Sequence, residues 1–201
     1  DTTRDGIELA EGSDRCTVRF NTITQSPLGV NCGSNRASSD GQFNDPQWKV
    51  AWDLWIAHKR YGFYDSCAIF IKRSVGGHRI HDNYIHDCWD GVSTQHWEHW
   101  KSTAAERLAW CDYNRGIEVD HNRIERLNDD GLEPNDGGVD QRWHHNYLQN
   151  VRCALRLKTI DKGPAYFYAN QFKDNGEDIR CYGELELNPA EIYVYHNSGT
   201  A

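Results

Sequence analysis

The 201-residue sequence predicts an all-β solenoid, a coil of parallel strands with about six to eight rungs. One observation is a repeated pattern: an apolar residue, two variable residues, Asn, one variable residue and an apolar residue. A second is a small or turn residue followed by a β-forming residue, seven to nine positions after each Asn. A unit of about 24 residues with two short strands cannot bury a face alone, so these units must stack.

The Asn motif sets one strand and one corner of each coil. Its copies are VRFNTI (18–23), IHDNYI (80–85), VDHNRI (119–124), WHHNYL (143–148), FYANQF (167–172) and the partial VYHNSG (194–199). Strands stacked about 4.8 Å apart place like residues above one another, so each Asn amide can bond the amide of the next coil. In the alternative interpretation, each Asn supplies left-handed geometry to an isolated hairpin turn.

The second mark sets the strand that follows. Its copies are Gly29-Val30, Gly91-Val92, Gly131-Leu132, Ala154-Leu155 and Asp178-Ile179, preceded by Asp5-Gly6-Ile7. Alignment on this mark predicts an outward column of Glu8, Asn31, Ser93, Glu133, Arg156 and Arg180. The next outward column contains Ala10, Gln95, Asn135, Lys158 and Tyr182. An inward column of Leu9, Cys32, Leu157 and Cys181 predicts thiols that are either buried or bridged.

Two insertions interrupt the repeat, at about 34–65 and 96–114, and both leave the coil after the strand of the second mark. Each is expected to be partly helical because its tryptophans recur at helical spacing, as Trp97 and Trp100 do. These side chains would either pack the insertions onto the coil or form the wall of a carbohydrate groove.

Composition excludes several classes of protein. Lys and Arg number 22 against 30 Asp and Glu, a net charge of −8, which argues against a non-specific nucleic-acid binder. No run of about eighteen apolar residues exists, so no membrane span is expected. The seven Cys show no CxxC spacing. The chain begins at Asp1 without a signal-like segment, and both ends cut a coil, so we expect an excised piece whose bare ends invite end-to-end stacking.

The N-x-[ILF] and D-G-[IVL] pattern over residues 5–33 and 66–198 resembles the secreted right-handed parallel β-helix proteins. That group includes NosD-like repeats and carbohydrate-processing β-helices. The resemblance implies a single right-handed β-helix domain over 1–201, in a secreted or periplasmic protein that engages a polysaccharide. The fold itself hosts lyases, hydrolases, epimerases and non-catalytic proteins, so activity must come from the site.

A cluster of charged residues is predicted where LNDDGLEPND (127–136) lies beside ALRLKT (154–159). The first hypothesis is β-elimination on a uronate-containing polysaccharide, which needs a base and a neutraliser for the substrate carboxylate. Lys158 would be the base, with its pKa lowered by Arg156 and burial, and Asp130 would join the catalytic set. The neutraliser would be Arg156 or a Ca²⁺ ion held by Glu133, Asn135 and Asp136. This set resembles β-helix polysaccharide lyases. Substrate-binding residues would be Glu133, Asn135, Gln95, Trp97, Trp100 and Arg180.

Other readings stay open at this cluster. A glycoside hydrolase would use Asp130 as acid with Asp129, Glu133 or Asp136 as partner. NDDG and RLK resemble motifs of pectin hydrolases, although the N-T-D and His-Gly motifs of that family are missing. Structurally, Glu133 over Arg156 would be a cross-rung ion pair. A third hypothesis is a non-catalytic β-helix that binds glycans or assembles end to end.

A column of His81, Asp120 and His144 also falls in register. The outer two would be about 9–10 Å apart at the backbone, too far for easy convergence on one Zn²⁺ ion. Stacked, solvated histidines are therefore the favoured expectation for this column.

Overall fold

The computed structural model describes residues 5–24, 67–94, 112–135, 139–158, 160, 162–181 and 191–200. These residues form strands and turns, and no helix occurs among them. The predicted insertions at 34–65 and 96–114 lie outside the described residues except for 112–114, which form a turn.

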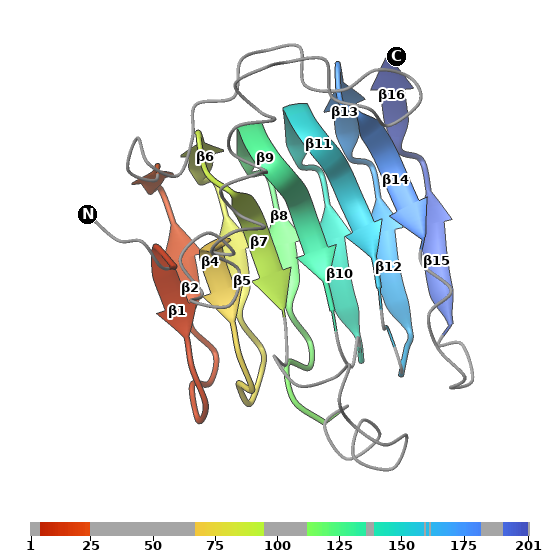
Figure 1. Ribbon diagram of the computed structural model, residues 1–201. Coiled ribbons are helices and arrows are strands. Elements are labelled where there is room, and N and C mark those ends of the chain that lie inside the picture. The colour runs from red at the N-terminus through yellow and green to blue at the C-terminus, as the bar shows by residue number, and fades with distance from the viewer. Residues whose placement is uncertain are drawn as a thin grey trace, which may run out of the picture.

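The strands form two parallel sheets whose members follow one another from the N-terminal to the C-terminal end (Figure 1). The ten-stranded sheet contains β1 (Ile7–Leu9), β3 (Thr22–Ile23), β4 (Cys67–Ile71), β6 (Tyr84–His86), β7 (Asp90–Thr94), β9 (Arg123–Pro134), β11 (Tyr147–Leu157), β13 (Gln171–Lys173), β14 (Glu177–Cys181) and β16 (Ser198–Thr200). The six-stranded sheet contains β2 (Thr17–Arg19), β5 (Arg79–His81), β8 (Glu118–Asp120), β10 (Gln141–His144), β12 (Ala165–Tyr168) and β15 (Ile192–Tyr195).

Each coil contributes one strand to the six-stranded sheet and two segments to the ten-stranded sheet, as a parallel β-solenoid requires. In β9 and β11 the two segments join into one long strand, with a change of register between Val151 and Cys153. The chain therefore returns to the same sheet one level higher after each coil, which confirms the predicted parallel stacking.

The predicted Asn ladder is present. The Nδ2 atom of each Asn donates to the Oδ1 atom of the Asn in the next coil at 2.9–3.1 Å, and the same Oδ1 accepts the backbone N–H of the donor residue. The ladder runs through Asn21, Asn83, Asn122, Asn146, Asn170 and Asn197. The left-handed conformation of the hairpin alternative occurs instead at the residue before each Asn, for example at Ala169 with φ 54°.

The small residues of the second mark allow a close approach of neighbouring coils. A Cβ atom on Gly91 would lie 2.2 Å from the carbonyl oxygen of Gly131, and one on Gly131 would lie 2.4 Å from Leu148. The corner therefore excludes a larger residue at these two positions on steric grounds. Inside the coil, apolar residues stack in register, as in the buried column Ile69, Val92, Leu132 and Leu155.

Two details of the predicted columns are wrong. Phe70, rather than Asn31, follows Glu8 in the outward column, because β1 pairs directly with β4; Asn31 and Cys32 lie outside the described residues. Cys181 aligns with Leu157 as expected. However, Cys181 is exposed and its thiol is free, because it lies in the last described strand paired to β11.

Candidate functional site

Charged side chains gather on β7, β9 and β11 of the ten-stranded sheet. We call this group the β9–β11 charge cluster; it comprises Asp90, Asp129, Asp130, Glu133, Arg152, Arg156 and Lys158. The register pairs Cys153 with Asp130 and Leu155 with Leu132, so the carboxylates of β9 lie beside the cations of β11 and of the residue that follows it. The structure thus brings together Asp130, Glu133, Arg156 and Lys158, which sequence analysis placed side by side.

The ion pairs differ from the expected one. Lys158 Nζ lies 2.7 Å from Glu133 Oε1, and Arg156 Nη1 lies 2.7 Å from Asp130 Oδ2. Arg152 pairs with Asp129. The predicted ion pair of Glu133 with Arg156 is therefore wrong. Arg156 and Lys158 each pair with a carboxylate that comes two or three residues before their register neighbour.

The cluster has two layers. The carboxylates of Asp129, Asp130 and Glu133 are buried, and Ser93 Oγ donates to Glu133 Oε2 at 3.0 Å. The cationic side chains keep partial exposure, 14% for Arg156 and 21% for Lys158. An anion arriving from solvent would therefore meet the cations first.

The environment moves the pKa values of the two central carboxylates in opposite directions. Burial, reinforced by the charges of Asp129 and Glu133, raises the pKa of Asp130 well above its ordinary value. Burial acts in the same sense on Glu133, but the attraction of Lys158 and Arg156 outweighs it and lowers the pKa of Glu133. Asp130 Oδ1 is buried with no hydrogen-bond partner in the described part of the chain. Asp130 is thus the carboxylate in the cluster most disposed to hold a proton.

Lys158 is not the low-pKa amine that sequence analysis expected. Burial lowers its pKa, yet the negative charges of Glu133 and Asp130 overcome that effect and raise the pKa above the ordinary value. A lysine in this state carries its proton at neutral pH and has no lone pair with which to act as a base.

The remaining predicted residues divide into two groups. Gln95, Trp97, Trp100 and Asp136 lie outside the described residues. Asn135 is buried, and its backbone N–H donates to the Thr94 carbonyl at 2.9 Å. Arg180 is the register neighbour of Arg156 but pairs with Glu177, at 3.1 Å.

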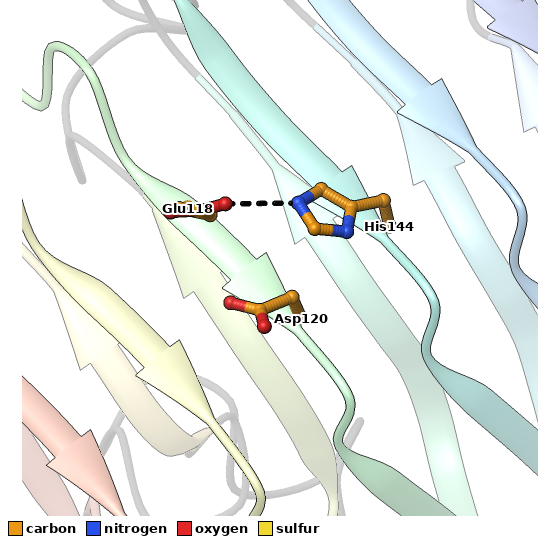
Figure 2. A group of neighbouring side chains, drawn as sticks. All are labelled: Glu118, Asp120 and His144. Atoms are coloured by element: carbon orange, nitrogen blue, oxygen red, sulfur yellow. Dashed lines mark hydrogen bonds and ion pairs between the residues drawn. The ribbon is translucent and has the colours of Figure 1, made fainter.

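A second group lies on the outer face of the six-stranded sheet. We call it the histidine cluster; it comprises Glu118, Asp120, His121, His144 and His145. Figure 2 shows Glu118, Asp120 and His144, with His144 Nε2 3.0 Å from Glu118 Oε1. One donor atom from each of these three residues lies within 4.8 Å of the other two.

The partners of this cluster are well defined. Arg79 forks onto Asp120, with Nε at 3.0 Å from Oδ1 and Nη2 at 2.9 Å from Oδ2, and His121 Nδ1 lies 2.7 Å from Oδ2. Burial opposes ionisation, but Arg79 and His121 lower the pKa of Asp120. Burial also lowers the pKa of His144, against the pull of Glu118, so its imidazole is neutral at neutral pH.

The register confirms the predicted column of His81, Asp120 and His144. His81 bonds its neighbour Asp82 at 2.7 Å, and Glu118, which sequence analysis did not single out, contacts His144. The available signal was the alternation Glu118-Val119-Asp120, which puts both carboxylates on one face of a strand.

Among the described residues, no helix has the length and apolarity that crossing a bilayer requires. We find no protein family model, no curated protein and no solved structure that this chain matches. The assignment that the chain supports by itself is an all-β protein of parallel, stacked coils with polar clusters on two outer faces.

Proposed function

We propose that this chain is a secreted, right-handed parallel β-helix that cleaves an acidic, uronate-containing polysaccharide at the β9–β11 charge cluster. The observation that carries the proposal is the pair of opposite pKa shifts at Asp130 and Glu133 beneath a layer of cations. Environments that separate the pKa values of neighbouring carboxylates are typical of acid–base catalysis. The cations supply attraction for a substrate that carries carboxylates.

Hydrolysis is the reaction that these charge states favour. Protonated Asp130 would donate to the glycosidic oxygen as the bond to the sugar breaks. Asp129, paired with Arg152, would act on the anomeric carbon. One oxygen of Asp129 lies within 4.8 Å of one oxygen of Asp130. With Asp129 as the nucleophile, water would release the glycosyl group from Asp129 in a second step, and hydrolysis would retain the anomeric configuration.

Substrate binding would also uncover the acid. Arg156 covers Asp130 through the 2.7 Å contact to Oδ2. A uronate carboxylate would compete with Asp130 for the guanidinium of Arg156. It can accept two parallel N–H bonds from that guanidinium, and Arg156 would then leave Asp130. Asp130 then loses its nearest cation at the moment when its proton is needed.

β-Elimination is the second candidate. It is favoured by two neighbouring cations, Arg156 on β11 and Lys158 directly after that strand. Lys158 could serve as the base only after leaving Glu133, because that carboxylate keeps it protonated. The Ca²⁺ ion proposed with this reaction would use Glu133 and Asn135, and would have to displace the ammonium group 2.7 Å from Glu133 Oε1. Neither hydrolysis nor the binding of uronate by Arg156 requires that ion.

The test is incubation with pectate, alginate, chondroitin and heparin, with Ca²⁺ or with EDTA, following reducing ends and unsaturated uronate in parallel. Reducing ends without unsaturated uronate would establish hydrolysis, and both together would establish β-elimination. Asp130→Asn should abolish cleavage, while Glu177→Gln, an acid-to-amide change on the neighbouring β14, should leave it intact. Cleavage that survives Asp130→Asn would overturn the assignment of the site. No cleavage of any substrate would leave a glycan-binding or structural β-helix.

End-to-end association is a further part of the proposal. Among the described strands, β15 lies at one edge of the six-stranded sheet and exposes all four of its residues. Two of them, Ile192 and Val194, continue the inward apolar columns. Unpaired edges of this kind template pairing with another strand. Sedimentation at increasing protein concentration, compared between the parent and Val194→Lys, would detect it.

A further inference from the structure

We propose that the histidine cluster binds one divalent transition-metal ion of the zinc class through His144 Nε2 and the carboxylates of Glu118 and Asp120. This site lies on the six-stranded sheet and is independent of the polysaccharide-cleaving function. Figure 2 shows the three side chains projecting from the same side of β8 and β10.

The parallel register explains why the donors converge. His144 is the register partner of Asp120, and Glu118 lies two residues earlier on the same strand, so all three point to one face. Zn²⁺ bonds of about 2.0–2.2 Å place tetrahedral ligand atoms about 3.3–3.6 Å apart. The His144 Nε2 to Glu118 Oε1 distance is 3.0 Å, and the other separations are within 4.8 Å. Side-chain rotations alone would close the remaining gap.

The contact between His144 and Glu118 places two metal-binding atoms side by side. The hydrogen bond between His144 Nε2 and Glu118 Oε1 requires one proton between the two atoms. A metal ion in that place would bond both atoms, and the neutral imidazole would carry its proton on Nδ1 instead. Coordination therefore needs a change of tautomer and leaves the strand pairing that positions the ligands unchanged.

The surrounding side chains supply the contacts that orient metal ligands. His144 Nδ1 lies 2.8 Å from His145 Nδ1, so a metal-bound His144 would donate its remaining N–H to His145. Asp120 is held by the fork of Arg79 and by His121 Nδ1. Arg79 fixes the carboxylate and offsets one of the two negative charges. Asp120 Oδ2 accepts from both Arg79 and His121, whereas, among the described residues, Oδ1 accepts only from Arg79 and retains a second lone pair for a metal.

The donor types select the ion. An imidazole nitrogen with two carboxylates suits Zn²⁺ and its transition-metal neighbours, whereas Ca²⁺ takes oxygen ligands only. A second group with donor atoms close together consists of Asp90, Asp129 and Asp130. This group offers no nitrogen donor, and Arg152 and Arg156 form ion pairs with two of its carboxylates. In the described part of the chain, the histidine cluster is therefore the better transition-metal site.

The experiment titrates Zn²⁺ into the metal-stripped protein by calorimetry and records the visible spectrum after Co²⁺ addition. We expect one high-affinity ion per chain, a Co²⁺ spectrum of low coordination number, and no comparable heat from Ca²⁺. His144→Ala and Glu118→Gln should each weaken binding at least about 100-fold, and Arg79→Lys, an outer contact, about 10-fold. The matched controls His196→Ala and Glu191→Gln, on exposed residues of the last described coil, should bind as the parent does.

Either of two results would overturn the site: no stoichiometric binding by the parent, or equal binding by the parent, His144→Ala and Glu118→Gln. Circular dichroism establishes whether each variant folds. If His144→Ala misfolds, Glu118→Gln decides alone, because its side chain is 37% exposed and the change preserves its size. Loss of binding in His196→Ala would place the ion elsewhere.

Discussion

Two stacks of polar side chains run through the same coils, and they are built on opposite plans. The Asn ladder repeats one neutral residue, and each amide serves as donor to one neighbour and acceptor for the other. The β9–β11 charge cluster mixes acidic and basic residues, and each of its cations pairs with a particular carboxylate. A stack of one self-complementary residue can be extended indefinitely and is structural. A stack of unlike charges is confined to one part of the coil, and such a place is a candidate for a catalytic or binding site.

The largest effect should come from breaking the ladder in its middle. Asn146 is fully buried and takes part in four side-chain hydrogen bonds, two as acceptor from Asn122 and two as donor to Val119 and Asn170. Asn146→Ala should lower the free energy of unfolding by about 4 kcal/mol, since several buried groups lose their partners together. Urea unfolding measures the change. Asn197→Ala, at the partly exposed last described rung, is the control and should cost about half as much; equal costs would contradict a cooperative ladder.

An intermediate effect is expected in the charge cluster. Glu133→Gln leaves the Lys158 ammonium without its carboxylate and should cost about 2 kcal/mol, less than a fully buried pair because Lys158 keeps some contact with water. Adding Lys158→Met should recover at least half of that loss. Urea unfolding of the four proteins in this double-mutant cycle gives the coupling. Were the double variant as unstable as the sum of the single changes, Glu133 and Lys158 would not be energetically coupled.

Asp130→Asn should have the smallest effect of the three at acidic pH, and its effect should change with pH. Because the folded pKa of Asp130 is raised above its ordinary value of 3.8, its favourable contribution is complete below that value and is lost as pH rises toward the folded pKa. The variant should therefore gain stability relative to the parent across that window, by up to about 1.4 kcal/mol per pH unit.

Glu133→Gln provides the opposite sign for the same measurement. The folded pKa of Glu133 is lowered, so its contribution is complete above the ordinary value of 4.5 and is lost as pH falls through the folded pKa. Unfolding curves of both variants from acid to mildly alkaline pH test the pair of slopes. Parallel slopes would mean that the two carboxylates share one environment.

The sequence was enough to predict what repeats. Because each Asn is surrounded by the same apolar positions, the ladder, the parallel stacking and the neighbourhood of Asp130 and Arg156 could all be derived from spacing. The strand that contains Phe70 was missed because Gly29-Val30 matches the second mark at the expected distance from Asn21, whereas Ala68-Ile69 lies far beyond it in the sequence.

What does not repeat was beyond sequence reasoning. We expected burial and Arg156 to lower the pKa of Lys158. The direction of the shift depends instead on the distance from Lys158 to Glu133, which the column alignment does not fix. Likewise, the choice of Glu118 over His81 as partner of His144 depends on side-chain direction across a strand boundary. Both outcomes depend on the placement of side chains, which the register of the strands does not fix.

The one-way sense of the Asn ladder gives the molecule an electrical axis. Every amide from Asn21 to Asn170 donates one N–H to the oxygen of the Asn in the next coil toward the C-terminus, so the amide oxygens from Asn83 onward face the preceding coil. The second N–H of the amides from Asn83 onward donates to a backbone carbonyl of the preceding coil. The amide dipoles therefore add head to tail and polarise one another along the stack, as peptide dipoles do in a helix. The C-terminal end of the ladder is the positive pole and the N-terminal end is the negative pole. Ions and dipolar groups approaching along the axis would meet two unlike ends.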